Sequence, residues 1–231
     1  MSLRRHTDED IERTVIRLRE SVDATLDKRS GQLVSQYFHD PDRFGAGFVG
    51  SSFESLGDNN ADRFGFDDVA VLSPMGHRLR PAALRALMAD EAGEFSRHLS
   101  SIPDNVDVWE ADDAALSTID RLFTELVRLP SVDWSTATSL LARKRPRLVL
   151  LYDVTVELQF SLEPRDPLWW AFRQMLSSEP KLVDRIEDLR PDQQDAKGVS
   201  VLRLLYVAGW MRASGTKAAR EARLDAGLAP S

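Results

Sequence analysis

Apolar residues recur at helical spacing through most of this chain, and that period constrains its fold more than any other feature. Between Thr7 and Lys28 the apolar positions fall three or four residues apart, and Thr7 is placed to cap the first turn. Only Leu148–Leu151 resembles a strand. The pattern predicts an all-α fold. Further helices are expected from Asp67 or Asp68 to Leu72, Pro81 to Leu99, Asp112 or Asp113 to about Arg128 and Val199 to Arg212, with shorter ones beginning at Asp153, Asp166 and Pro180.

The length of the chain allows one large domain. Its 231 residues can bury a substantial core, and neither a repeat nor a low-complexity run divides them. We expect a single helical domain over residues 1–215. Residues 216–231 are rich in alanine and charge, so we expect a weakly ordered C-terminal tail there.

Composition excludes several classes of protein. No run of about 18 apolar residues is present, and the first residues lack the apolar centre of a secretory signal. Cysteine is absent, which rules out disulfides, cysteine-ligated zinc and iron–sulfur clusters. A cytoplasmic protein that neither enters nor spans a membrane is the simplest interpretation.

The segment 43–66 is rich in glycine and phenylalanine, and residues Asp40 to Asn60 are interpreted as an ordered loop or short turns. It contains Gly45-Ala-Gly47-Phe-Val-Gly50, a formal match to the dinucleotide-binding pattern, but no strand precedes it, so we interpret it as a plain loop. Its five phenylalanines are expected to anchor this loop to the helices. They are Phe44, Phe48, Phe53, Phe64 and Phe66. The four histidines are not at metal-ligand spacing, and we expect neither a metal nor a cofactor.

The stretch from Leu129 to Ala137 is the strongest pointer to a function. It reads Leu-Pro-Ser-Val-Asp-Trp-Ser-Thr-Ala, which predicts a tight turn between two helices. The start of the second helix would present unpaired N–H groups and a positive dipole end, which suit a phosphate. We therefore predict nucleic-acid contacts at Ser131, Trp134, Ser135 and Thr136.

A dense basic cluster follows this turn. Arg143, Lys144, Arg145 and Arg147 stand within five residues and are predicted to neutralise DNA or RNA phosphates beside the turn. The alternative is a solvated loop, or pairing with acids such as Glu157, Glu163 and Asp166. The formal net charge of −7 argues against a protein that coats nucleic acid non-specifically.

Residues 113–160 resemble the helix-hairpin-helix DNA glycosylase superfamily, whose pattern runs L-P-G-V-G-P-K-T-A and later V-D-x-H-V. The matching hairpin letters are Leu129, Pro130, Val132, Thr136 and Ala137, and Tyr152-Asp153-Val154-Thr155-Val156 stands at the second motif. The stretch Thr136–Leu148 with Tyr152-Asp153 also resembles an uncharacterised bacterial family. The first resemblance implies a glycosylase-like helical fold.

Three departures from the glycosylase pattern bear on its chemistry. Ser131 and Asp133 replace the hairpin glycines, and the Asp133 carboxylate would repel a phosphate. Ser135 replaces the lysine of the lyase members, so imine chemistry is excluded at that position. The resemblance implies a catalytic acid at Asp153, whereas the residues alone allow a simple helix cap.

These observations leave three hypotheses. The first is a helical protein that binds nucleic acid through a degenerate hairpin without catalysis. The second is a monofunctional base-excision N-glycosylase that uses Asp153. The third is a protein-interaction module that has lost DNA binding, which Ser131, Asp133 and the acidic balance favour.

Overall fold

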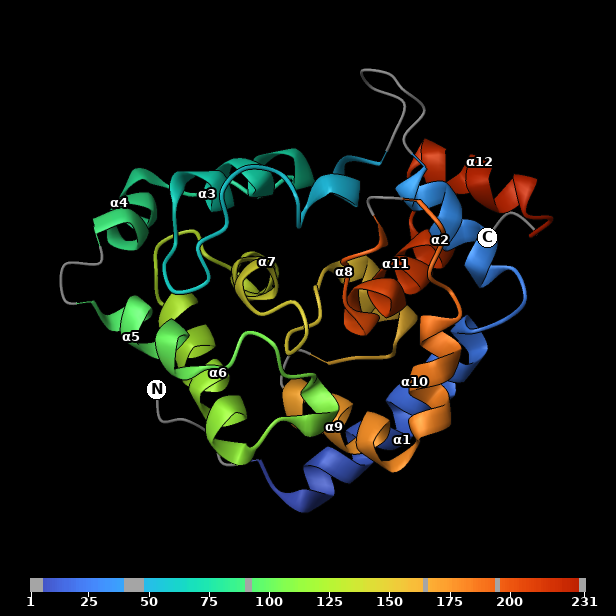
Figure 1. Ribbon diagram of the computed structural model, residues 1–231, viewed down its shortest axis with the longest axis horizontal. Coiled ribbons are helices and arrows are strands. Elements are labelled where there is room, and N and C mark those ends of the chain that lie inside the picture. Colours follow the sequence, from blue (N-terminus) through green and yellow to red (C-terminus); the bar gives the residue numbers. More distant parts are fainter. Residues whose placement is uncertain (1–5, 40–47, 90–92, 164–165, 194–195, 229–231) are drawn as a thin grey trace.

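The computed structural model describes residues 6–39, 48–89, 93–163, 166–193 and 196–228, and within these ranges it contains helices and no strand. The all-α prediction is therefore confirmed (Figure 1). The α-helices are α1 Asp8–Thr25, α2 Ser30–Phe38, α3 Phe66–Leu72, α4 Pro81–Ala89, α5 Glu94–Ser101, α6 Asp113–Leu126, α7 Trp134–Lys144, α8 Val154–Gln159, α9 Leu168–Ser178, α10 Pro180–Glu187, α11 Val201–Ala213 and α12 Lys217–Asp225.

The helices from the two ends of the chain pack together on one side of the molecule. Helices α1 and α2 pack on α9 and α11, so the N-terminal helices complete a core built mainly by the C-terminal third. Helices α3 to α6 form the other side, with α7 seen end-on between them and α11 (Figure 1). Helix α7 therefore lies near the middle of the fold.

Helix α7 is enclosed on all sides. Every residue from Thr136 to Lys144 is buried, although the segment contains five polar or charged side chains besides its apolar ones. A helix that is buried all round usually carries apolar residues on every face. In α7 the polar side chains instead form hydrogen bonds to groups inside the protein, and the surrounding elements pack around the helix.

Helix α11 is the second enclosed helix, and its prediction from Val199 to Arg212 is confirmed to within two residues. Ten of its residues are buried, from Val201 to Met211. Gly209 is the close-approach point, because a Cβ there would lie 2.6 Å from Cζ of Phe160. Glycine at this position lets α8 and its following turn lie against α11.

Some predicted elements differ in the structure. Leu148–Leu151 is a buried irregular segment rather than a strand. The helix predicted from Pro81 to Leu99 is two helices, and Gly93, with φ +60°, caps the second one. Part of the predicted tail forms α12, in which Ala219, Ala222 and Arg223 are buried.

The Gly45–Gly50 motif lies mostly outside the described residues. Of the five phenylalanines expected to anchor this region, Phe53 and Phe64 are buried, Phe48 packs partly against the core, and Phe44 lies outside the described ranges. Phe66 is the exception, because 72% of it is exposed. Its expected anchoring role is therefore wrong.

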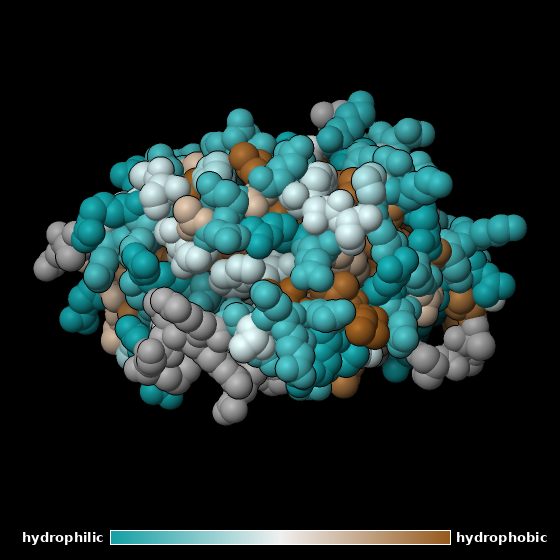
Figure 2. All heavy atoms as spheres, turned by 90° about the horizontal axis from the view of Figure 1, so that it is seen from below, coloured by the Kyte–Doolittle hydropathy of each residue, from teal (hydrophilic) through white to brown (hydrophobic). Residues whose placement is uncertain are grey.

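The described surface is mainly hydrophilic. Figure 2 shows one face on which charged and polar residues surround a compact hydrophobic patch. None of the described helices combines the length and apolarity that crossing a bilayer demands.

Candidate functional site

The turn between α6 and α7 is exposed and tightly built. Pro130 and Ser131 face solvent, and the amide of Val132 donates to the carbonyl of Leu129 at 3.1 Å. Ser131 has a φ of 68°, in the left-handed region that non-glycine residues adopt only rarely. The turn therefore takes, with a serine, a conformation that glycine adopts most easily.

The first turn of α7 begins at a capping acid. The Asp133 carboxylate accepts the amide of Thr136 at 2.8 Å. Burial raises the pKa of Asp133. Hydrogen bonds from Thr136 and the electrostatic attraction of the nearby His77 lower it by more, so the pKa lies below its usual value. A carboxylate thus already occupies part of the positive end of this helix, beside the half-buried Trp134 and Ser135.

The segment from His77 to Arg80 crosses the same end of α7. The amide of Arg80 donates to Oγ of Ser131 at 2.7 Å, and the His77 ring lies 3.1 Å from Oγ1 of Thr136. Its other ring nitrogen lies 3.2 Å from Oγ of Ser139. Sequence reasoning missed this segment, since no local signal links it to a turn about 50 residues away.

Two exposed cations come to the turn with this segment. Arg78 and Arg80 both face solvent, and neither forms an ion pair with any residue in the described ranges. Arg78 and Arg80 lie beside the exposed α6–α7 turn, where α7 begins. This end of α7 therefore combines free positive side chains with one fixed carboxylate.

The basic cluster lies elsewhere, and mostly inside the protein. Arg143 is 1% exposed and pairs with Asp68, with 2.8 Å between Nε and Oδ1. Its guanidinium also donates to the backbone carbonyls of Phe53, Leu56 and Asp58. This side chain therefore ties the end of α7 to the segment before α3.

The next two residues continue the same pattern. Nζ of Lys144 lies 2.6 Å from Oδ2 of Asp68 and 2.9 Å from Oδ1 of Asn59. Arg145 donates to the carbonyls of Ala61, Leu99 and Ile102, among others. Burial lowers the pKa of Lys144, and Asp68 opposes that shift. Through these bonds, the three consecutive cations hold residues 53–62 and the end of α5 against α7.

The interpretation of the cluster as a solvated loop is therefore wrong for Arg143, Lys144 and Arg145. The suggested pairing with Glu163 and Asp166 is also wrong, because both of those acids pair with Arg17. Buried and internally bonded groups offer no surface to a phosphate in this conformation.

Arg147 is the member of the cluster that remains at the surface. Its side chain is 45% exposed and forms an ion pair with Asp107. The hydrogen bond from Arg147 to Asp107 raises the pKa of the guanidinium further. The structure does not bring Arg147 together with the other three cations.

Asp153 begins α8 as its N-cap. Its Oδ1 accepts the amide of Val156 at 2.9 Å, and its Oδ2 accepts the hydroxyl of Tyr206 at 2.9 Å. Burial raises the pKa of Tyr206 well above its usual value, so this phenol stays a donor. Each carboxylate oxygen is therefore already engaged, one by the helix and one by α11.

Tyr206 connects Asp153 to a second buried charge. The Arg203 guanidinium lies 5.1 Å from the Tyr206 ring centroid and 2.8 Å from the carboxylate of Glu54. Burial raises the pKa of Glu54, while Arg203 opposes the shift. Arg203 and Tyr206 are buried in this network, whereas the Glu54 side chain is 21% exposed.

The described residues contain no group of three or more His, Asp or Glu side chains arranged to hold a metal ion.

Comparisons with known proteins give one match. A family model with the description "Family of unknown function (DUF6308)" matches residues 30–213, which is most of the chain. Neither the curated proteins nor the solved structures contain a match.

Proposed function

The chain belongs to the family of unknown function DUF6308, and we propose that it binds nucleic acid, without acting on it, through the exposed turn between α6 and α7. The observation that carries this proposal is the backbone of Ser131. This residue adopts a left-handed conformation in an exposed turn, at the position where the glycosylase hairpin pattern has glycine. The chain thus adopts with a serine a demanding local conformation that glycine adopts most easily.

The chemistry of the turn supports a phosphate ligand. The first amides of an α-helix have no partner inside the helix, and those of Trp134 and Ser135 begin α7. The half-buried hydroxyl of Ser135 adds a donor at the same end. Backbone donors of this kind hold a nucleic-acid backbone without reading its sequence.

The positive charge in this proposal comes from Arg78 and Arg80 rather than from the basic cluster. Both arginines are exposed, and the backbone of Arg80 is hydrogen-bonded to Ser131. Arg143, Lys144 and Arg145 are occupied by internal partners, and Arg147 pairs with Asp107. Two cations and the overall charge of −7 favour weak, salt-sensitive binding.

Fluorescence anisotropy with labelled single- and double-stranded oligonucleotides tests the proposal. We expect binding at low ionic strength that weakens as salt rises, and a loss of at least about tenfold for the pair Arg78→Glu and Arg80→Glu. The matched control is Lys28→Glu with Arg220→Glu, which changes the net charge equally at exposed positions away from the turn.

A second variant asks whether the phosphate meets Asp133. Asp133→Asn keeps an oxygen to cap α7 but removes the charge, so we expect it to tighten binding. The proposal fails if no binding occurs at low salt, or if the Arg78/Arg80 pair and the control weaken binding alike. The first of these outcomes would favour the protein-interaction hypothesis.

Base excision by Asp153 stays a prediction. The acid caps a helix, which is the role that the residues alone allow, and Tyr206 and Val156 occupy its two oxygens. Catalysis would require Tyr206 to break its hydrogen bond to Oδ2 of Asp153, so that this oxygen could contact the substrate. Excision of a damaged base by the wild type, lost in Asp153→Asn, would support this function, and full activity in that variant would remove Asp153 from the mechanism.

A further inference from the structure

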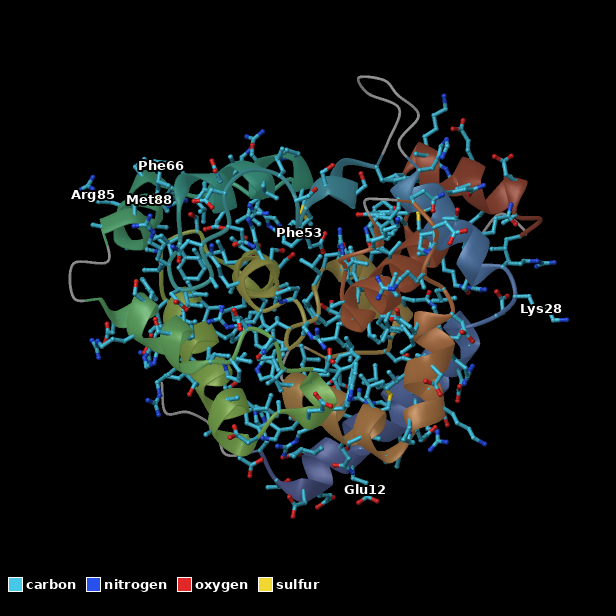
Figure 3. All side chains as sticks on the ribbon, viewed as in Figure 1. Glu12, Lys28, Phe53, Phe66, Arg85 and Met88 are labelled. Atoms are coloured by element: carbon cyan, nitrogen blue, oxygen red, sulfur yellow. The ribbon has the colours of Figure 1, made fainter. Side chains whose placement is uncertain are left out.

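A surface pocket of about 370 Å³ opens between residues 58–68 and α4. This volume is in the range of pockets that hold small molecules. Phe66, from the start of α3, and Met88, from α4, lie at the pocket in the upper left of Figure 3. The pocket lies in the part of the chain that the buried cations clamp, and it takes no part in the nucleic-acid proposal.

The walls of the pocket are held in place before any ligand arrives. The amide of Asp58 donates to Oδ2 of Asp67 at 2.6 Å, and the amide of Gly65 donates to Oδ2 of Asp68 at 2.7 Å. Behind them, Arg143 binds Asp68 and the carbonyl of Asp58. A preorganised pocket loses less conformational entropy when it binds a ligand.

The apolar part of the lining includes an unusually exposed ring. Phe64 is buried beneath the pocket, and the partly buried Met88 adds a thioether from α4. Phe66 is 72% exposed, although its neighbours in α3 pack on α7. An aromatic ring left in water beside a pocket offers contact area to an apolar ligand group.

The polar part of the lining carries both signs of charge. The carboxylates of Asp58 and Asp67 and the guanidinium of Arg63 line the pocket, and none of the three forms an ion pair with another residue in the described ranges. Asp68 is different, because Arg143 and Lys144 already neutralise it. The groups without a counter-charge are therefore two acids and one base, and of these Asp67 already accepts the amide of Asp58 with Oδ2.

We propose that this pocket binds a free amino acid with an apolar side chain. Its ammonium group would meet Asp58 and Asp67, its carboxylate would meet Arg63, and its side chain would lie against Phe66 and Met88. This zwitterion is the class of ligand that uses all three features of the lining. A bare metal ion uses neither the ring nor Arg63, and an anion such as a phosphate would face two carboxylates.

Isothermal titration calorimetry with L-phenylalanine and two blocked analogues tests the assignment. L-Phenylalaninamide lacks the carboxylate, and N-acetyl-L-phenylalanine lacks the ammonium group. We expect the amino acid to bind at millimolar concentration or below, and each analogue to bind at least about tenfold more weakly. An amide that binds as tightly as the amino acid would overturn the proposal in favour of a simple cation site, and so would the absence of any binding at millimolar amino acid.

Variants show whether the binding occurs in this pocket. Arg63→Gln should weaken the amino acid about tenfold and leave the amide unchanged, because only the amino acid carries the carboxylate that Arg63 meets. Phe66→Ala should weaken both, and because Phe66 is 72% exposed the variant should keep its fold. Arg85→Gln is the matched control, since Arg85 is exposed on α4 but does not line the pocket. If Arg63→Gln behaves like Arg85→Gln, the assignment is wrong.

Discussion

Arg143 and Asp68 form an ion pair in the interior of the protein, with 2.8 Å between Nε and Oδ1 and with neither side chain more than 1% exposed. The same carboxylate accepts Nζ of Lys144 at 2.6 Å. Backbone carbonyls around residues 53–58 satisfy the remaining donors of Arg143. The desolvation of these charges is therefore offset by dense, charge-assisted hydrogen bonding.

Removing the charge of Asp68 should destabilise the protein strongly. Asp68→Asn leaves two buried cations without a counter-charge, and breaking such a pair typically costs about 3–5 kcal/mol. Urea unfolding followed by circular dichroism measures the change. Asp67→Asn is the control, because its side-chain oxygen can still accept the amide of Asp58, and it should change stability by less than about 1 kcal/mol. Equal losses in the two variants would contradict the buried role of Asp68.

Two arginines of the basic cluster should differ sharply when truncated. Arg145 is 1% exposed and donates to the carbonyls of Ile102, Ala61 and Leu99, so Arg145→Ala should cost about 3 kcal/mol or more through unsatisfied acceptors and lost packing. Arg147 is 45% exposed, and its pair with Asp107 should contribute about 1 kcal/mol or less. Thermal unfolding of both variants gives the comparison. A larger loss for Arg147→Ala would mean that the interior position of Arg145 is wrong.

Gly209→Ala should destabilise a helix that alanine ordinarily stabilises. The new Cβ would lie 2.6 Å from Cζ of Phe160, whose ring is fully buried. Overpacking of this kind costs about 1–3 kcal/mol. At Gly31 in α2 a Cβ meets nothing within 4 Å, so Gly31→Ala should stabilise by up to about 1 kcal/mol. Opposite signs in denaturant unfolding are the expected result, and a gain from Gly209→Ala would contradict the close approach of α11 and Phe160.

His77 should make stability fall in mild acid. Burial lowers its pKa below the usual 6.5, and the Asp133 and Asp153 carboxylates only partly oppose this. The unfolded state therefore binds more protons than the folded state as pH falls from about 6.5 through the folded-state pKa. The contribution of a neutral His77 is complete above that window and is lost below it.

Urea unfolding of the wild type and His77→Gln on both sides of pH 6.5 isolates this effect. Glutamine can still bond to Thr136 and Ser139 but does not titrate, so the variant should lose less stability on acidification. Asp133 is coupled to His77, but its pKa lies below the usual value for an aspartate, so the difference between the two proteins near pH 6.5 belongs to His77. An identical pH dependence would show that His77 is not buried as described.

Local sequence predicted most of the helices because helix formation depends on neighbours a few residues apart. The capping role of Thr7 is confirmed by its bond to the amide of Asp10, and the cap at Asp112 by its bond to Ala115. The break in the helix expected from Pro81 to Leu99 was not foreseen, because apolar spacing alone does not show where a chain turns.

The candidate site was only partly predictable. The turn at Ser131 and the helix start at Asp153 come from short motifs, and both positions hold the expected elements. The exposed cations beside the turn, Arg78 and Arg80, belong to a segment about 50 residues earlier in the chain, so no motif could place them there. The partner of Asp153 is Tyr206, again about 50 residues away.

The sequence by itself determined where most of the helices begin, which faces are apolar and that the fold is all-α, because these properties arise from local backbone bonding and side-chain period; the starts of α2 and α5 were not predicted. Only the tertiary structure decided that most of the basic cluster is buried. A run of Arg and Lys has the same local pattern whether it faces water or the interior. Its burial depends on Asp68 and on the carbonyls of residues 53–62, which approach α7 from about 75 to 90 residues away in the chain.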